Sequence, residues 1–249
     1  MSRCWRLLGT GIAFATFGLG GLVLAYLIIP CIWLLPSKQA KKYAAQAAIS
    51  RTFACFTLLL RLLRLGSVDF IGFEKLADDK GCLWLANHPT LLDYVFIVSR
   101  LRRCDTMVKA ALWDNFFLSG AVKAAGYIPN RRDASTFEAI DATLTQGHNL
   151  LMFPEGTRSR AGQPLKLERG AAQVAVRLTR PIRLISIHCR PTILEKGEKW
   201  YKISKEKPKL TITVGPRLEP STFIDEGRPY SILARELTRT LTEYFERER

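Results

Sequence analysis

The first 35 positions are dominated by apolar residues, and the pattern changes after them. Residues 7–35 include no charged side chain, and about 20 apolar residues are enough to cross the hydrocarbon core of a bilayer. This run therefore predicts one membrane-spanning helix. Glycines and prolines interrupt it at Gly18, Gly20, Gly21 and Pro30, and Pro36 follows it. A kinked or re-entrant hairpin that enters one leaflet is the alternative, because both residue types interrupt regular helices.

Positive charges flank the apolar run on both sides. Arg3 and Arg6 precede it, while Lys38, Lys41 and Lys42 follow it. The larger cluster favours a cytoplasmic location for the segment after the run. We therefore expect an inner (cytoplasmic) membrane protein whose main domain lies on the cytoplasmic side. A cleaved signal peptide is disfavoured, since the run is long for one and no small-residue cleavage site ends it.

Residues 43–65 show the periodicity of an amphipathic helix. Apolar side chains recur at helical spacing, with arginines between them, at Phe53, Phe56, Leu59, Leu60 and Leu63. Such a helix suits a membrane interface or the surface of a folded domain, and the pattern does not decide between the two. We interpret residues 1–65 as a membrane anchor with an interfacial helix, and residues 66–249 as one folded domain.

After Gly66, short strands and helices alternate along the chain. Strands are predicted at residues 83–86, 106–110, 127–128, 150–153 and 182–189, and helices at 89–100, 115–125, 135–146, 170–179 and 229–248. Residues 200–214 have the pattern of a β-hairpin. Strands separated by helices of this length predict an α/β fold with a mixed, mostly parallel sheet covered by helices.

Composition and charge narrow the classes of partner. The 249 residues are 48% hydrophobic and 24% charged, which is the composition of a folded chain. The net charge of +15 favours an anionic partner: a lipid surface, a nucleic acid or a phosphorylated substrate. No zinc-finger or RNA-binding aromatic motif is present, so we expect no nucleic acid. Six scattered cysteines and three distant histidines predict no metal site.

A histidine and an aspartate stand five residues apart in the block at 87–93. Pro89 is of the type favoured at the first helical position, so we expect His88 in a strand-to-helix turn with its ring reaching Asp93. A carboxylate on one imidazole nitrogen fixes the tautomer and strengthens the other nitrogen as a base. A hydroxyl nucleophile needs such a base. The spacing alone also fits a histidine that caps a helix beside a solvated aspartate.

The second block, at 153–159, follows a predicted buried strand that Pro154 ends. Its turn lies at the carboxyl end of the strand, where open α/β sheets place their ligands. Gly156 lets the backbone approach a ligand closely, and Arg158 offers a fork of donors that suits phosphate. Thr157 adds a hydroxyl, and we expect Glu155 to orient Arg158 or the acceptor. An ordinary surface turn is the alternative. Together, the two blocks predict acyl transfer to a phosphorylated alcohol.

Both blocks closely resemble motifs of the glycerolipid acyltransferases, the 1-acylglycerol-3-phosphate acyltransferase group. The first motif of that family is N-H-x-[ST]-x-x-D, and the third is F-P-E-G-T-R-S. The second motif, glycine-x-isoleucine followed by arginine, corresponds to Gly126, Ile128 and Arg131. The resemblance covers roughly residues 65–195. Pro129 and Asn130 depart from the residues common before that arginine, and residues 184–187 lack the proline of the fourth motif.

The resemblance implies a membrane-bound O-acyltransferase of phospholipid biosynthesis with His88 as general base and Asp93 as its partner. It implies transfer from an acyl-CoA or acyl-carrier-protein thioester to the free hydroxyl of a lysophospholipid such as lysophosphatidate, with no cofactor and no acyl-enzyme. The residues expected around the acceptor are Asn87, Thr90, Gly126, Arg131, Glu155, Gly156, Thr157 and Arg158. Two alternatives stay open: an aminolipid, glycolipid or pigment as acceptor, and a non-catalytic basic protein that binds anionic lipid.

Overall fold

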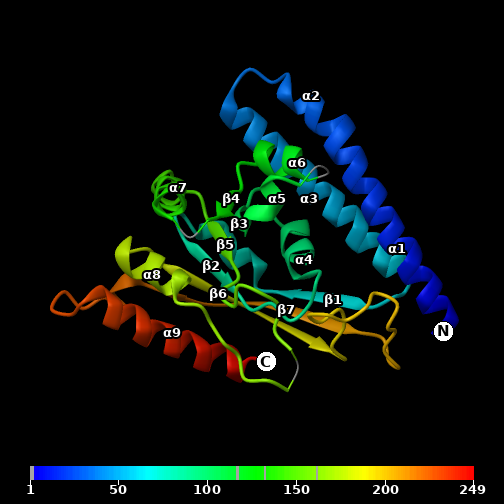
Figure 1. Ribbon diagram of the computed structural model, residues 1–249. Helices are drawn as coiled ribbons and strands as arrows, with labels where there is room; N and C mark the ends of the chain where they lie inside the picture. The colour runs from blue at the N-terminus through cyan, green and yellow to red at the C-terminus, as the bar shows by residue number, and fades with distance from the viewer. Residues whose placement is uncertain (1–2, 116–117, 132, 161) are drawn as a thin grey trace.

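The computed structural model describes residues 3–115, 118–131, 133–160 and 162–249 and is built on a seven-stranded sheet (Figure 1). The strand order is β1-β7-β6-β2-β5-β3-β4. Every neighbouring pair is parallel except β6 and β7, which are antiparallel. The mixed, mostly parallel sheet is confirmed. The strands are β1 (Ser67–Ile71), β2 (Leu83–Ala86), β3 (Asp105–Lys109), β4 (Ile128–Asn130), β5 (Leu150–Met152), β6 (Ile182–Arg190) and β7 (Lys209–Leu218).

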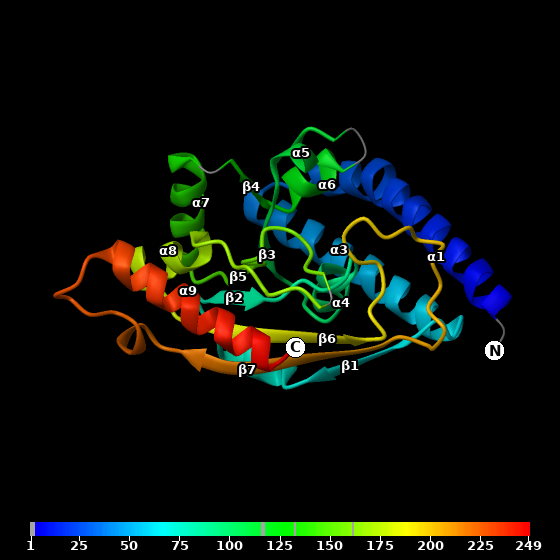
Figure 2. The same cartoon turned by 60° about the horizontal axis from the view of Figure 1, so that its bottom comes forward.

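Helices cover both faces of this sheet, because the central strands are apolar on both sides. Leu83 and Leu85 join one hydrophobic cluster, while Trp84 joins the other, since successive side chains of a strand alternate. The first cluster is covered by α7 (Ala134–Thr145), α8 (Gly170–Arg177) and α9 (Tyr230–Arg247). The second is covered by α3 (Lys38–Leu62), α4 (Asp93–Ser99) and α6 (Ser119–Ala124), as Figure 2 shows.

The apolar N-terminal run forms one continuous helix. It consists of α1 (Arg3–Val23), a π-helical turn (Leu24–Ile28) and α2 (Ile29–Trp33), and it is long and apolar enough to cross a membrane. The glycines do not break it. The wider π turn lies just before Pro30, where a proline disturbs α-helical hydrogen bonding. No hairpin forms inside the run; instead α3 returns beside it (Figure 1).

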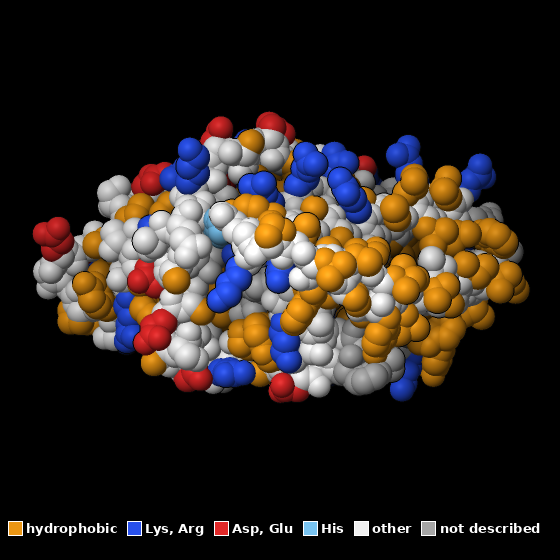
Figure 3. Space-filling model, turned by 90° about the horizontal axis from the view of Figure 1, so that it is seen from above, with side chains coloured by type: hydrophobic (Ala, Val, Ile, Leu, Met, Phe, Trp, Pro, Cys, Tyr) orange, Lys and Arg blue, Asp and Glu red, His pale blue; other side chains and the backbone are white. Residues whose placement is uncertain are grey.

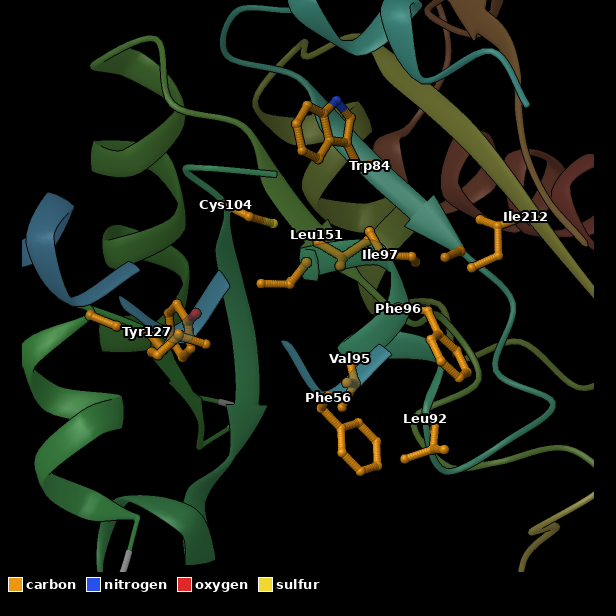
Figure 4. Packing of buried hydrophobic residues seen from close by; sticks show 14 of the residues in the cluster. Phe56, Trp84, Leu92, Val95, Phe96, Ile97, Cys104, Tyr127, Leu151 and Ile212 are labelled. Atoms are coloured by element: carbon orange, nitrogen blue, oxygen red, sulfur yellow. The ribbon is translucent and has the colours of Figure 1, made fainter. Parts of the chain in front are cut away.

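The second arm, α3, packs on the folded domain. It begins at Lys38 rather than near Tyr43, because the Ser37 hydroxyl accepts a hydrogen bond from the Ala40 N–H and caps the helix. Phe56 of α3 lies in one cluster with Phe96 of α4 (Figure 4). Of the two interpretations of this amphipathic helix, the structure shows packing on the domain. The helices of residues 3–62 therefore share a hydrophobic core with the sheet.

A buried polar network also joins α3 to the sheet. Asp105, at the start of β3, forms an ion pair with Lys42 Nζ at 2.8 Å and accepts a hydrogen bond from Gln46 Nε2 at 3.1 Å. His148 Nδ1 lies 3.3 Å from the same carboxylate, and His148 Nε2 lies 2.9 Å from the Tyr43 hydroxyl. Burial lowers the pKa of His148, and the positive charge of Lys42 lowers it further. Both effects favour the neutral form of His148, while the Asp105 carboxylate acts in the opposite direction.

This network predicts that stability falls as the pH falls. The pKa of His148 is lower in the folded chain than in the unfolded chain, so the unfolded chain takes up the proton first. Stability is then lost as the pH decreases below the ordinary histidine pKa of about 6.5. We expect His148→Gln to have a smaller drop in Tm between about pH 7.5 and about pH 5 than the wild type. Parallel Tm curves for the two proteins would contradict this assignment.

Two strands differ from the sequence prediction. The hairpin predicted at 200–214 is wrong: β7 is one long strand that pairs with β6 on one side and β1 on the other, and residues 202–208 form an irregular connection. The strand β1 was not predicted, because it alternates between exposed and half-buried positions at the edge of the sheet.

Two helices begin later than expected. The helix after β2 begins at Asp93 rather than Pro89, because residues 89–92 form an irregular turn in which Thr90 binds the Asp93 side chain. The helix expected at 115–125 is shorter, at Ser119–Ala124, and a separate turn of helix, α5 (Ala110–Trp113), precedes it. Residues 116 and 117 of that prediction lie outside the described residues.

Candidate functional site

The site begins where β2 ends, and Asn87 holds that end in place. Its side-chain Nδ2 donates to the Ile187 carbonyl at 2.8 Å, and its Oδ1 accepts from the Ile187 N–H at 2.6 Å. Asn87 is buried, so its amide continues the pairing of β2 with β6 by one more residue. We interpret it as a residue that fixes the position of the following histidine.

His88 and Asp93 form the hydrogen-bonded pair that the sequence predicts. His88 Nδ1 lies 2.8 Å from Asp93 Oδ2. Thr90 reinforces the aspartate: its N–H donates to Asp93 Oδ2 at 2.7 Å, and its hydroxyl donates to Oδ1 at 2.6 Å. With three donors around it, the carboxylate orients the ring and leaves Nε2 as the nitrogen that can accept a proton.

Solvent reaches the two members of this pair differently. The Asp93 side chain is fully buried, whereas 20% of the His88 side chain is exposed. Burial raises the pKa of Asp93, and the hydrogen bonds from His88 and Thr90 act in the opposite direction. A substrate can therefore reach the imidazole, while the carboxylate behind it is shielded.

The turn that follows β5 lies directly against His88. Glu155 Oε1 accepts the His88 N–H at 2.7 Å, and the Ser159 N–H donates to the His88 carbonyl at 3.0 Å. The Phe153 ring stacks on the imidazole with centroids 4.5 Å apart. Burial raises the pKa of Glu155. Glu155 thus binds the backbone of His88, and no contact with Arg158 is among its described hydrogen bonds.

Comparisons with known proteins agree with this geometry. A chloroplastic 1-acyl-sn-glycerol-3-phosphate acyltransferase of Brassica napus is 24% identical over 135 residues, which cover 52% of this chain and 39% of that protein. A 1-acyl-sn-glycerol-3-phosphate acyltransferase of Chlamydomonas reinhardtii is 27% identical over 169 residues, covering 64% and 49%. The family model named Acyltransferase matches residues 67–188, which include both blocks. Residues 67–188 therefore form a domain of the Acyltransferase family, and the relatives named above are glycerolipid acyltransferases.

Two further facts qualify the likeness to this family. The chain spans less than half of the length of these two curated relatives. The crystal structure of the 1-acyl-sn-glycerophosphate acyltransferase PlsC from Thermotoga maritima matches with a TM-score of 0.71 and 19% identity, over 98% of both chains. At that identity the match shows a shared fold, which extends over the N-terminal helices as well as the sheet.

In this acyltransferase domain, Arg158 joins the turn to the connection between β6 and β7. Its Nη1 donates to the Leu194 carbonyl at 2.7 Å and to the Glu195 carbonyl at 3.1 Å. Leu194 has a φ of 52°, in the left-handed region that few residues other than glycine adopt. Arginine carries five N–H donors, so this use of Nη1 leaves others with which Arg158 can bind a phosphate.

The tip of the turn is open to a ligand. Gly156 and Thr157 are both exposed, and Gly156 has a φ of 67°, which a residue with a side chain adopts only at a cost. Both residues follow β5 at the carboxyl edge of the sheet, the edge at which His88 also lies. The glycine is therefore needed for the shape of the turn as well as for access.

Of the second motif, one residue lies at the same edge of the sheet as His88 and another lies towards the opposite edge. Arg131 directly follows β4, so it lies at the same edge as His88, exposed and three strands away, or about 14 Å at the usual strand spacing. Gly126 lies before β4, towards the opposite edge. It ends α6 with a φ of 67° and lies beside Lys42. In the structure it terminates a helix, because glycine tolerates the left-handed conformation, and its placement near the acceptor stays a prediction.

Several contacts at the site were not anticipated. Phe153 and Ser159 belong to the second block, but neither was expected to touch His88. Ile187 and Leu194 act through backbone atoms. Every residue except proline offers the same backbone donors and acceptors, so no side-chain pattern marks such positions in a sequence.

A cavity of about 700 Å³ lies between α1, α3, the start of β1 and the connection that leads to β7. Its wall includes Leu92, four residues after His88, and Leu194, whose carbonyl binds Arg158. Phe14, Phe56 and Phe70 add apolar surface, as do other residues of these elements. We call it the apolar cavity. Its size and lining are those of a site for a small, largely apolar ligand.

Proposed function

We propose that this chain is a membrane-bound O-acyltransferase that moves a fatty acyl group from a thioester to the free hydroxyl of a lysophospholipid. The observation that carries the proposal is the His88–Asp93 pair, held at 2.8 Å and placed against the turn after β5. The two curated relatives described above are 1-acyl-sn-glycerol-3-phosphate acyltransferases, which supports lysophosphatidate as the acceptor.

The proposed reaction needs no covalent enzyme intermediate. His88 Nε2 takes the proton of the acceptor hydroxyl while its oxygen attacks the thioester carbonyl, and the new C–O bond forms. The tetrahedral intermediate then collapses and the C–S bond breaks. The departing thiolate takes up the proton from the imidazolium, which Asp93 has stabilised. The products are an ester and a free thiol, and His88 returns to its initial state.

The apolar cavity is our proposed site for the acyl chain of the donor. It lies beside Leu92 and Leu194, so a chain inside it has its carbonyl end near the His88 turn. Cationic side chains also line the cavity, at Arg6, Arg61 and Arg100. We propose that the apolar part holds hydrocarbon, because removing a chain from water is strongly favourable.

An exposed apolar surface on α1 and α2 supports attachment to a membrane. Figure 3 shows this surface, with lysine and arginine side chains around its margin. Leu8, Leu19 and Leu27 are 58%, 63% and 64% exposed. Soluble monomers rarely expose a contiguous apolar patch of this kind. We propose that this surface is buried in the bilayer and that the sheet lies on the cytoplasmic side of the inner membrane, as the lysines after the run favour.

The test is an in vitro transfer assay with the purified full chain in phospholipid vesicles. We expect release of free thiol from acyl-CoA or acyl-carrier protein, matched mole for mole by phosphatidate when lysophosphatidate is the acceptor. Mass spectrometry of the lipids identifies the product. Turnover with an aminolipid or glycolipid acceptor but not with lysophosphatidate would overturn the proposed acceptor. Binding to anionic vesicles with no thiol release from any donor would overturn the enzyme proposal.

A further inference from the structure

A second hollow, of about 610 Å³, lies on the other side of the connection between β6 and β7. Its walls come from residues 195–202 of that connection, from the start of α1 and from the residue that follows the second block. Figure 2 shows this connection running beside α1. Five cationic side chains line the hollow: Arg3, Arg160, Lys196, Lys199 and Lys202. We call it the basic hollow.

Most of this positive charge is not neutralised within the protein. The hollow contains two carboxylates, Glu195 and Glu198, and Glu198 is paired with Lys202 at 2.8 Å. Within the described parts of the chain, Arg3, Arg160, Lys196 and Lys199 form no ion pair within 4.0 Å. A hollow lined mainly by one sign of charge concentrates its field and attracts anions.

The basic hollow is attached to the candidate active site. Its wall residue Glu195 accepts a hydrogen bond from Arg158 through its carbonyl, at 3.1 Å. The next residue of the turn, Ser159, binds the His88 carbonyl at 3.0 Å, and Arg160 follows it into the hollow. Lys202 lines both the basic hollow and the apolar cavity. The two hollows therefore adjoin, and each reaches the His88 turn through one or two residues.

We propose that the basic hollow binds the phosphorylated nucleotide end of an acyl-CoA donor. The inference rests on the proposed function. An acyl-CoA has an apolar chain at one end, a pyrophosphate and a 3′-phosphate at the other, and the reacting thioester between them. The apolar cavity and the basic hollow match these two ends on either side of residues 195–202. The lysines and arginines supply charge-assisted hydrogen bonds to the phosphates.

Two features favour a nucleotide over an acidic carrier protein. The site is concave and of the volume that suits a small ligand, whereas a protein partner needs a broad complementary surface of about 800 Å² on each side. Tyr201 lines the hollow and is 56% exposed, so its ring is available for stacking on an adenine base.

The main test is the double variant Lys196→Glu/Lys199→Glu, assayed with two donors. One is acyl-CoA, and the other is the same acyl chain on N-acetylcysteamine, which has the thioester but no phosphate. We expect the KM for acyl-CoA to rise about tenfold or more, while the KM for the short donor and the KM for lysophosphatidate stay unchanged. Arg235→Glu/Arg239→Glu, at two exposed arginines on α9, is the charge-matched control and should change none of these constants.

A binding measurement gives a readout that does not depend on turnover. We expect adenosine 3′,5′-bisphosphate to bind the wild type in calorimetry, more weakly as salt is added, and at least tenfold more weakly to the double variant. The proposal is overturned if the double variant raises the KM for lysophosphatidate or for both donors equally. It is also overturned if only acyl-carrier-protein turnover suffers, or if only vesicle binding falls. Nucleotide binding in a wild type that turns over no donor would instead refute the proposed function.

Discussion

Replacing His88 with alanine is expected to lower kcat for acyl transfer by about 10²–10⁴-fold, the range of a positioned general base. The imidazole lies between the Asp93 carboxylate, 2.8 Å from its Nδ1, and the turn after β5. Without it the acceptor hydroxyl keeps its proton and remains a poor nucleophile. The measurement is the rate of thiol release at saturating donor and acceptor.

Loss of the ring must be separated from loss of the fold. The Phe153 ring loses its stacking partner in His88→Ala, so we expect a modest drop in Tm with unchanged vesicle binding. His148→Ala provides a control, since His148 lies at the opposite edge of the sheet and its loss should leave kcat near the wild-type value. A His88→Ala protein that folds and retains wild-type kcat would refute the role of His88 as base.

Asp79→Ala is expected to destabilise the protein by about 3–5 kcal/mol, the cost of leaving a buried charge without its partner. The Asp79 carboxylate is fully buried and accepts two hydrogen bonds from Arg183, at 2.8 and 3.0 Å. It also accepts one from the Trp84 indole at 2.9 Å. Its removal leaves the guanidinium of Arg183, a buried residue on β6, without this carboxylate partner. The measurement is the denaturant midpoint and slope of unfolding in detergent.

A double-variant cycle tests whether the unpaired charge of Arg183 causes the loss of stability in Asp79→Ala. Adding Arg183→Met to Asp79→Ala removes the unpaired guanidinium, and we expect it to restore part of the lost stability. An additive effect of the two substitutions would show that the contact between them contributes little. Asp69→Ala is the matched control, because its pairing with Lys209 is exposed and surface pairs contribute about 0–1 kcal/mol.

The parts of the fold that sequence predicts well are those with local boundary signals. The strand at Leu83–Ala86 was predicted with its observed bounds, since four apolar residues lie between polar segments. The helix at Gly170–Arg177 begins at a glycine and follows helical periodicity. In contrast, β1 and β7 pair with each other across more than 130 intervening residues. No local pattern in either strand identifies so distant a partner.

The candidate site likewise contains contacts that the sequence predicts and contacts that it does not. The pairing of His88 with Asp93 follows from side-chain chemistry and spacing, and it was predicted even though the helix begins four residues later than expected. The two bonds from Arg158 to the carbonyls of Leu194 and Glu195 were not predicted. They depend on how the connection between β6 and β7 folds back, which is a property of tertiary structure.

The reversal of chain direction at β7 has a practical outcome for anyone preparing this protein. Because β1 runs antiparallel to β6, it starts at the carboxyl edge of the central strands and brings the end of α3 there with it. Removing residues 1–65 to obtain a soluble fragment would therefore strip one wall from the apolar cavity. It would also expose Phe96 and uncover the Asp105 carboxylate. Together with the proposed membrane attachment, this favours preparing the full chain in detergent or lipid nanodiscs.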